Sequence, residues 1–206
     1  MNLKTTVYGV FIIESLENDD YFDGDNLNGI LNVAEIPAVY HTALSKTHLK
    51  ELLGDFRLSK FRYLYLSCHA NESGIDINGE DISNKELQEM AGSMPDVRIF
   101  MSACKGASRP LAKLMIGSSK ILSLIGSPDD IDQDKAAVFW PAFFYVMKEL
   151  DEEKMIRSNI STTLKKLVDL FNLPINYYSK INGDIHRLRQ LKIRPNKSTD
   201  NKKITI

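Results

Sequence analysis

The sequence contains little of what several large classes of protein depend on. It has 2 cysteines and 4 histidines among 206 residues, and none of them falls in a Cys-x-x-Cys or comparable zinc-binding spacing. Two cysteines in a chain of this length do not form a disulfide scaffold, which favours a reducing compartment such as the cytoplasm. We therefore expect neither a metal nor a structural disulfide.

Sequence motifs for nucleotides, membranes and serine hydrolases are missing as well. There is no Gly-x-Gly-x-x-Gly after the first strand-like segment, no Gly-x-x-x-x-Gly-Lys-Ser/Thr and no Gly-x-Ser-x-Gly. The formal net charge is -1, so the chain has no overall field that would attract nucleic acid or an anionic membrane. The longest apolar runs, 7–13 and 136–147, are too short to span a membrane. We expect no cofactor, no nucleic acid partner and no membrane segment.

Strand-like and helix-like segments alternate along the chain, which predicts parallel strands joined by right-handed helical connections. Strands are expected at 7–14, 35–43, 63–69, 97–103 and 120–126. Helices are expected at 45–56, 83–92, 109–115, 136–147 and 153–171. A loop rich in Asp, Asn and Gly is expected at 17–28, and Asn78-Gly79 predicts a β-hairpin within 74–81.

These segments predict one α/β domain over residues 1–194, because a chain with 43% hydrophobic content can bury a single large core. Its mostly parallel central sheet should be flanked by helices, which gives three layers. A small C-terminal β-hairpin is expected from 175–181 and 185–191. The polar segment 195–206 is expected to be disordered.

Two of the expected strands end on reactive side chains. Residues 63–70 read Tyr-Leu-Tyr-Leu-Ser-Cys-His-Ala, and residues 97–104 read Val-Arg-Ile-Phe-Met-Ser-Ala-Cys. Ligands gather outside the carboxyl ends of parallel strands, so His69 and Cys104 should face one crevice. An imidazole beside a thiol can take its proton and later protonate a leaving amine, which indicates a hydrolytic dyad. Cys68 should point to the opposite face from His69 and is expected to be structural.

The segments around His69 and Cys104 resemble the caspase-like cysteine peptidases, and most closely their bacterial CHAT branch. Shared features are a strand ending in His and a small residue, a polar hairpin, a helix, and a strand leading to Cys104-Lys105-Gly106. A weaker similarity covers 121–150, so the resemblance spans roughly residues 60 to 150. It implies a three-layer caspase-like fold, with Cys104 as nucleophile and His69 as acid and base. It also implies an oxyanion hole built from the backbone N–H groups of Ala70 and Cys104.

An acidic loop follows the strand expected at 120–126 and has two interpretations. Its carboxylates, among them Asp129, Asp130 and Asp132, can cap the next helix, where the helix dipole favours negative charge. Alternatively, one of them enters a specificity pocket and favours a basic residue before the scissile bond. In that case these residues bind substrate.

The resemblance implies an endopeptidase that cleaves a protein or peptide partner in the cytoplasm, in bacterial defence or another form of regulated proteolysis. It also implies a separate regulatory or sensor protein. Two alternatives stay open. An inactive interaction module of the same fold is suggested by Ala70, because the relatives usually have Gly after the His. A flavodoxin-like ligand-binding or receiver domain would explain the alternating strands and helices but leaves the placement of His69 and Cys104 accidental.

Overall fold

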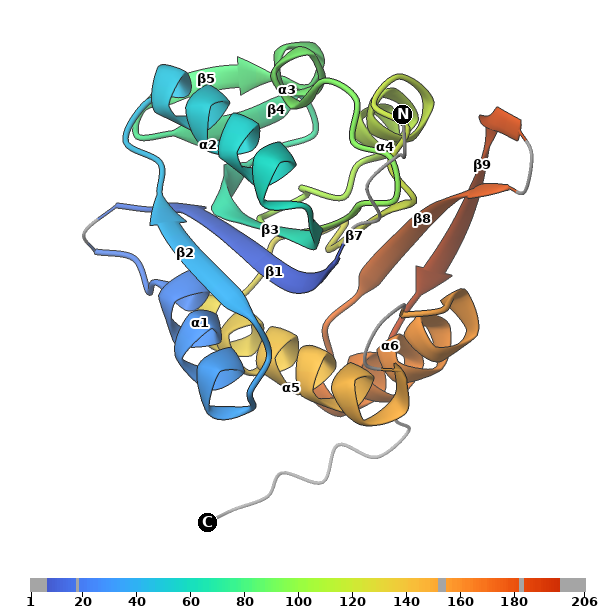
Figure 1. Ribbon diagram of the computed structural model, residues 1–206. Helices are drawn as coiled ribbons and strands as arrows, with labels where there is room; N and C mark the ends of the chain where they lie inside the picture. Colours follow the sequence, from blue (N-terminus) through green and yellow to red (C-terminus); the bar gives the residue numbers. More distant parts are fainter. Residues whose placement is uncertain (1–6, 18, 152–154, 182–183, 197–206) are drawn as a thin grey trace.

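A mostly parallel β-sheet forms the middle layer of the molecule (Figure 1). The computed structural model describes residues 7–17, 19–151, 155–181 and 184–196. The strands run across the sheet in the order β2 (Ala38–Thr42), β1 (Val7–Ser15), β3 (Phe61–Ala70), β6 (Arg98–Ser102), β7 (Ser123–Gly126), β8 (Ile175–Ile181) and β9 (Asp184–Ile193). The first five are parallel, whereas β8 and β9 are antiparallel to their neighbours. The expected sheet and its C-terminal strand pair are confirmed.

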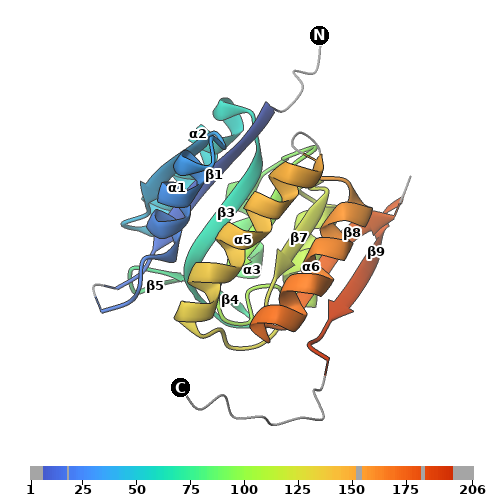
Figure 2. The ribbon, with the colours of Figure 1, turned by 90° about the horizontal axis from the view of Figure 1, so that it is seen from below.

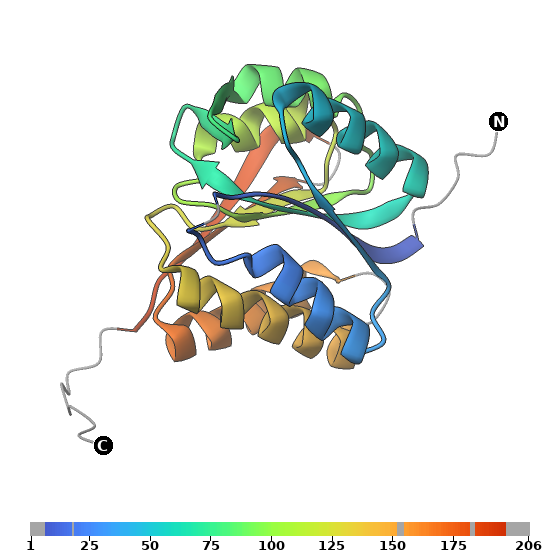
Figure 3. The same ribbon diagram turned by 90° about the vertical axis from the view of Figure 1, so that its left-hand side faces the viewer.

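Helices cover both faces of this sheet, so the three-layer prediction is also confirmed. One face is covered by α1 (Asp23–Val33), α5 (Gln133–Asp151) and α6 (Arg157–Phe171), which lie in front of the sheet in Figure 2. The other is covered by α2 (Lys46–Ser59), α3 (Asn84–Ala91) and α4 (Arg109–Gly117), and Figure 3 shows the sheet edge-on between the two layers. No helix in the described part of the chain is long and apolar enough to cross a membrane.

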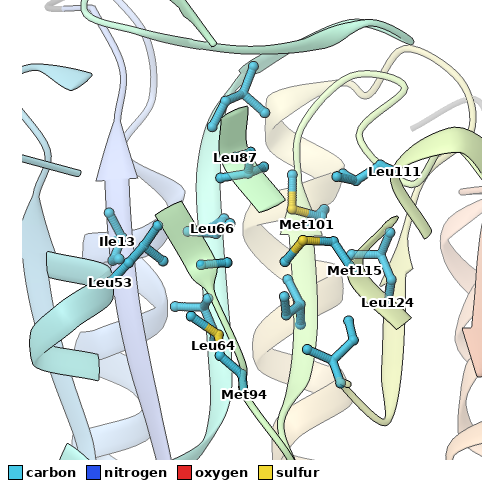
Figure 4. Packing of buried hydrophobic residues seen from close by; sticks show 14 of the residues in the cluster. Ile13, Leu53, Leu64, Leu66, Leu87, Met94, Met101, Leu111, Met115 and Leu124 are labelled. Atoms are coloured by element: carbon cyan, nitrogen blue, oxygen red, sulfur yellow. The ribbon is translucent and has the colours of Figure 1, made fainter. Parts of the chain in front are cut away.

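A separate hydrophobic core fills the space on each face of the sheet, because alternate side chains of a strand point to opposite faces. Leu64 and Leu66 of β3 belong to the core beneath α2, α3 and α4. Figure 4 shows how aliphatic and Met side chains pack there: Ile13, Leu53, Leu64, Leu66, Leu87, Met94, Met101, Leu111, Met115 and Leu124. Tyr65 belongs to the other core, which is aromatic and includes Phe100, Trp140 and Phe144. The two cores hold β3 and β6 in the centre of the molecule.

A small hairpin extends the carboxyl end of β3. It consists of β4 (Gly74–Ile77) and β5 (Glu80–Ser83), and β4 pairs antiparallel with β3 at His69 and Ala70. Asn78 and Gly79 form its turn with φ of 53° and 82°, as the sequence predicts. The hairpin leads into α3 through the predicted capping box of Ser83 and Glu86.

The expectation of a loop over 17–28 is wrong, because helix α1 begins at Asp23. Its sequence is rich in Gly and Asn, which disfavour helices and hide it from a propensity argument. Tertiary contacts compensate for this weak propensity. Leu27 and Leu31 are buried, and the Glu14 carboxylate accepts hydrogen bonds from the first turn of the helix.

Several element boundaries also differ from expectation. The strand expected at 35–43 begins only at Ala38, after Pro37 and after Glu35, which has a φ of 56°. The strand expected at 120–126 begins at Ser123, and the helix expected at 153–171 begins at Arg157. The segment 197–206, most of the tail expected to be disordered, lies outside the described residues.

Candidate active site

His69 and Cys104 line one pocket, at the carboxyl ends of β3 and β6. The two strands pair in register with Ser67 opposite Ser102. His69 lies on β3, two residues after Ser67, whereas Cys104 lies in the turn that follows β6, two residues after Ser102. The pocket has a volume of about 110 Å³. The structure therefore brings together the two residues that the sequence pairs as a dyad.

The Cys104 thiol is partly buried and stands on a tight turn. Its Sγ accepts a hydrogen bond from the backbone N–H of Ile131 at 3.4 Å. Lys105 adopts a φ of 55°, and its N–H donates to the carbonyl of Asp129 at 3.0 Å. A Cβ on Gly106 would lie 3.0 Å from that of Ala103, so a larger residue would crowd the turn. These contacts fix the thiol against the acidic loop.

The His69 ring is held by a carboxylate that sequence reasoning missed. Its Nε2 lies 2.9 Å from Oδ2 of Asp20, and 49% of the His69 side-chain surface is exposed. Asp20 also accepts hydrogen bonds from the Gln133 amide at 2.7 Å and the Glu17 N–H at 3.0 Å. Burial acts to raise the pKa of Asp20, but the hydrogen bonds from Glu17, Gln133 and His69 outweigh it and lower the pKa. An ionised Asp20 accepts the Nε2–H, which leaves Nδ1 as the ring nitrogen that can take a proton.

A second missed carboxylate, Asp23, also lines the pocket. Only 5% of its surface is exposed. It accepts hydrogen bonds from the hydroxyls of Tyr65 at 2.5 Å and Ser102 at 2.6 Å, and from that of Ser67. The sequence did hold a signal for it. Two serines occupy equivalent places on β3 and β6, and buried hydroxyls require a partner.

Another buried carboxylate, Glu14, holds the start of α1 against β1. It accepts hydrogen bonds from the N–H groups of Gly24 at 2.7 Å and Asp25 at 3.2 Å, and from the Tyr40 hydroxyl at 2.8 Å. Burial raises the pKa of Glu14; the nearby charge of Asp23 adds to the increase, and the hydrogen bonds oppose it. In the sequence, Glu14 is the last residue of the strand expected at 7–14.

The carboxylates predicted to bind substrate lie beside the pocket. Asp130 is exposed and forms an ion pair with Lys105 at 3.2 Å. Asp132 is also exposed and pairs with Lys135 at 2.5 Å. Asp129 contacts the turn at Cys104 and Lys105 through its backbone carbonyl. None of these three side chains is among the residues that line the pocket.

Ala70 and Cys68 flank His69 in different environments. The N–H of Asn71 donates to the carbonyl of Gly74 at 3.0 Å, so Ala70, one residue earlier, faces Ile75 as a non-hydrogen-bonded pair. Its N–H is therefore not used by β4.

Cys68 is buried in a hydrophobic core, and burial, with smaller effects from nearby carboxylates, raises its pKa to about 12. Its thiol is neutral at physiological pH.

In the described ranges, no group of three or more His, Cys, Asp or Glu side chains could hold a metal ion. Compared with known protein families and with curated proteins, the chain matches none.

What the pocket can do chemically follows from its own residues. A thiol, an imidazole held by a carboxylate, and a second, buried carboxylate meet in one small pocket, and such groups suit nucleophilic attack on a carbonyl.

Proposed function

We propose that this chain is a cysteine endopeptidase of the caspase-like, CHAT type, with Cys104 as nucleophile and His69 as general base and acid. The observation that supports this most is that both side chains line one pocket while Asp20 lies 2.9 Å from Nε2 of His69. Nucleophile, base and orienting carboxylate are the three parts that covalent hydrolysis of a peptide bond needs.

In the proposed reaction, Asp20 keeps the Nε2–H of His69 in place, and Nδ1 takes the proton of the Cys104 thiol. The thiolate attacks the peptide carbonyl, and the backbone N–H groups of Ala70 and Cys104 stabilise the oxyanion. His69 then gives the proton to the leaving amine, and a thioester forms at Cys104. Water, activated by the same imidazole, hydrolyses the thioester and restores the thiol.

The substrate in this proposal is a protein or peptide, and a separate regulatory or sensor protein controls the enzyme in the cytoplasm. These parts of the proposal rest on the family resemblance, as does a role in bacterial defence. A binding module without activity is the rival function. Two observations favour it: Ala70 stands where the relatives usually have Gly, and the Cys104 thiol already contacts the Ile131 N–H.

The decisive experiment measures cleavage of a peptide library by the wild type and by the variants Cys104→Ala, His69→Ala and the double variant. Each single change should abolish cleavage, and the double variant should be no worse, because the two side chains act as a unit. Cys68→Ser is the control and should keep most of the activity, because Cys68, although it also lines the pocket, is 5% exposed and packs in a hydrophobic core. Unchanged turnover in Cys104→Ala would exclude the proposal.

Ala70→Gly separates the peptidase from the inactive module. If the extra Cβ only narrows the oxyanion site, its removal should raise kcat/KM. If both the wild type and Ala70→Gly are silent towards every peptide, the chain is better described as an interaction module.

A further inference from the structure

Asp23 is a buried carboxylate with no lysine or arginine beside it among the described residues. Its hydrogen-bond partners are the neutral hydroxyls of Tyr65, Ser67 and Ser102. No residue that the structure describes forms an ion pair with it, and neither lysine nor arginine lines the pocket. Buried carboxylates in proteins are normally paired, because burial of an isolated charge is costly. Among the residues that the structure describes, the pocket thus offers no lysine or arginine as a counter-ion for Asp23.

The three hydroxyls hold the Asp23 carboxyl group in one orientation. Each donates to the carboxylate, and an ionised carboxylate only accepts hydrogen bonds. The negative charge also acts on its neighbours. Burial is the largest cause that raises the pKa of Tyr65 and of Cys68, and the charge of Asp23 is the second largest. The site is therefore preorganised for a positive group.

The size and lining of the pocket suit one long side chain. Its volume of about 110 Å³ is well below the roughly 300–1,000 Å³ of pockets that hold drug-sized ligands. The same pocket is lined by the apolar side chains of Leu16, Ile131 and Ala136. An aliphatic stem that ends in a cation matches apolar walls with a carboxylate among them.

We propose that Asp23 binds the side chain of a substrate lysine or arginine and so directs Cys104 to cut next to a basic residue. This inference rests on the proposed function and names its substrate class. The sequence assigned recognition of a basic substrate residue to the acidic loop, and this proposal assigns it to Asp23 on α1 instead. Asp130 and Asp132 of the loop are exposed and already form ion pairs with lysines. A bidentate arginine would add charge-assisted hydrogen bonds to Asp23.

The first test needs no catalysis. Alkylation of Cys104 by iodoacetamide is followed by mass spectrometry in the presence of butylguanidine, which mimics the arginine side chain, or butylurea, its neutral isostere. Butylguanidine should slow the alkylation of Cys104, whereas butylurea should not. Asp23→Asn should remove this protection. Asp25→Asn is the matched control: it removes an exposed carboxylate from the same helical turn and should keep the protection.

The second test compares peptides that differ only in the residue before the cut. The wild type should cleave after Arg or Lys at least about 100-fold faster than after Asp, since the pocket repels an acid. Asp23→Asn should lose about 100-fold in kcat/KM for the basic peptide and little for a neutral one. Circular dichroism checks that Asp23→Asn is folded, and the wild-type comparison of butylguanidine with butylurea needs no variant.

The outcomes separate this inference from the proposed function. Equal protection by butylguanidine and butylurea, or a basic preference that survives in folded Asp23→Asn, overturns the role of Asp23. If no peptide is cleaved whatever its sequence, the peptidase proposal fails, while the alkylation experiment still decides whether the pocket selects a cation.

Discussion

Asp20 is the side chain on which the orientation of the His69 ring depends. It lies 49 residues before His69 in the sequence, in the loop between β1 and α1. Its carboxylate is held in turn by the Gln133 side-chain amide and by the Glu17 backbone N–H. An imidazole fixed in this way loses less rotational freedom when it reaches the reactive geometry.

We therefore predict that Asp20→Asn lowers kcat by about 10- to 100-fold, a part of the usual contribution of acid–base catalysis. KM should change little, because Asp20 acts through His69 and does not contact the substrate. Steady-state kinetics on one peptide measures both constants. Asp19→Asn is the control, since it removes the exposed carboxylate next in sequence. A rise in KM at constant kcat would show that Asp20 binds substrate.

At the scale of elements, Glu14 joins β1, α1 and β2 through one buried carboxylate. It accepts hydrogen bonds from the start of α1 and from Tyr40 on β2. Burial raises its pKa from the ordinary value of 4.5. The folded protein therefore holds a proton on Glu14 at pH values where the unfolded chain has lost it.

The contribution of Glu14 to stability should consequently fall as pH rises. Below about pH 4.5 the carboxyl is protonated in both states, and above the raised pKa it is ionised in both. Between these limits the unfolded state binds fewer protons, so the free energy of unfolding decreases with pH. Urea unfolding of the wild type and of Glu14→Gln from pH 4 to 8 measures the difference. A difference that grows in favour of the wild type with pH would contradict the burial of this charge.

The junction of β6 and β7 depends on a glycine. A Cβ on Gly126 would lie 2.7 Å from the backbone oxygen of Met101, its partner across the two strands. Gly126→Ala should therefore cost about 1–3 kcal/mol of unfolding free energy. Gly29→Ala on α1 is the control: nothing lies within 4 Å of the added Cβ, and the helix should gain about 0.5–1 kcal/mol. Equal effects in urea unfolding would mean that β6 and β7 can move apart without cost.

At the scale of the whole molecule, Cys68 reports on global unfolding. It is buried in the central strand β3, and its pKa of about 12 leaves almost no thiolate to react. We predict that iodoacetamide modifies Cys104 in the native protein but reaches Cys68 only when the sheet opens. The alkylation rate of Cys68 should then rise with urea along the global unfolding curve. Modification of Cys68 at a rate independent of urea would indicate a local opening of β3.

The layers of the molecule could be predicted because strand and helix periodicities are local. Residues 63–69 and 97–103 are two mostly apolar segments, each about as long as a strand. Both strands appear where they were expected. Helix α1 could not be predicted in this way, because its Gly- and Asn-rich sequence is held by Glu14 and by buried leucines. Local patterns placed His69 and Cys104 at the ends of neighbouring strands.

The remaining pocket residues depend on contacts between distant parts of the chain. Asp23 accepts hydrogen bonds from Tyr65 and Ser102, which lie 42 and 79 residues later in the sequence. No local spacing rule relates residues so far apart in the chain. The acidic loop illustrates the same limit. Its charge was evident from the sequence, but the direction of its side chains is set by Lys105 and Lys135.

The hydrogen bond between Asp20 and Gln133 also has a consequence for how the protein is made. The two residues are 113 positions apart, which a ribosome translating roughly 5–20 residues per second covers in about 6–23 s. A nascent chain thus contains the thiol of Cys104 and the ring of His69 before Ile131 and Gln133 exist to complete the pocket around them. The pocket of the proposed peptidase therefore cannot be complete before Gln133 has been synthesised.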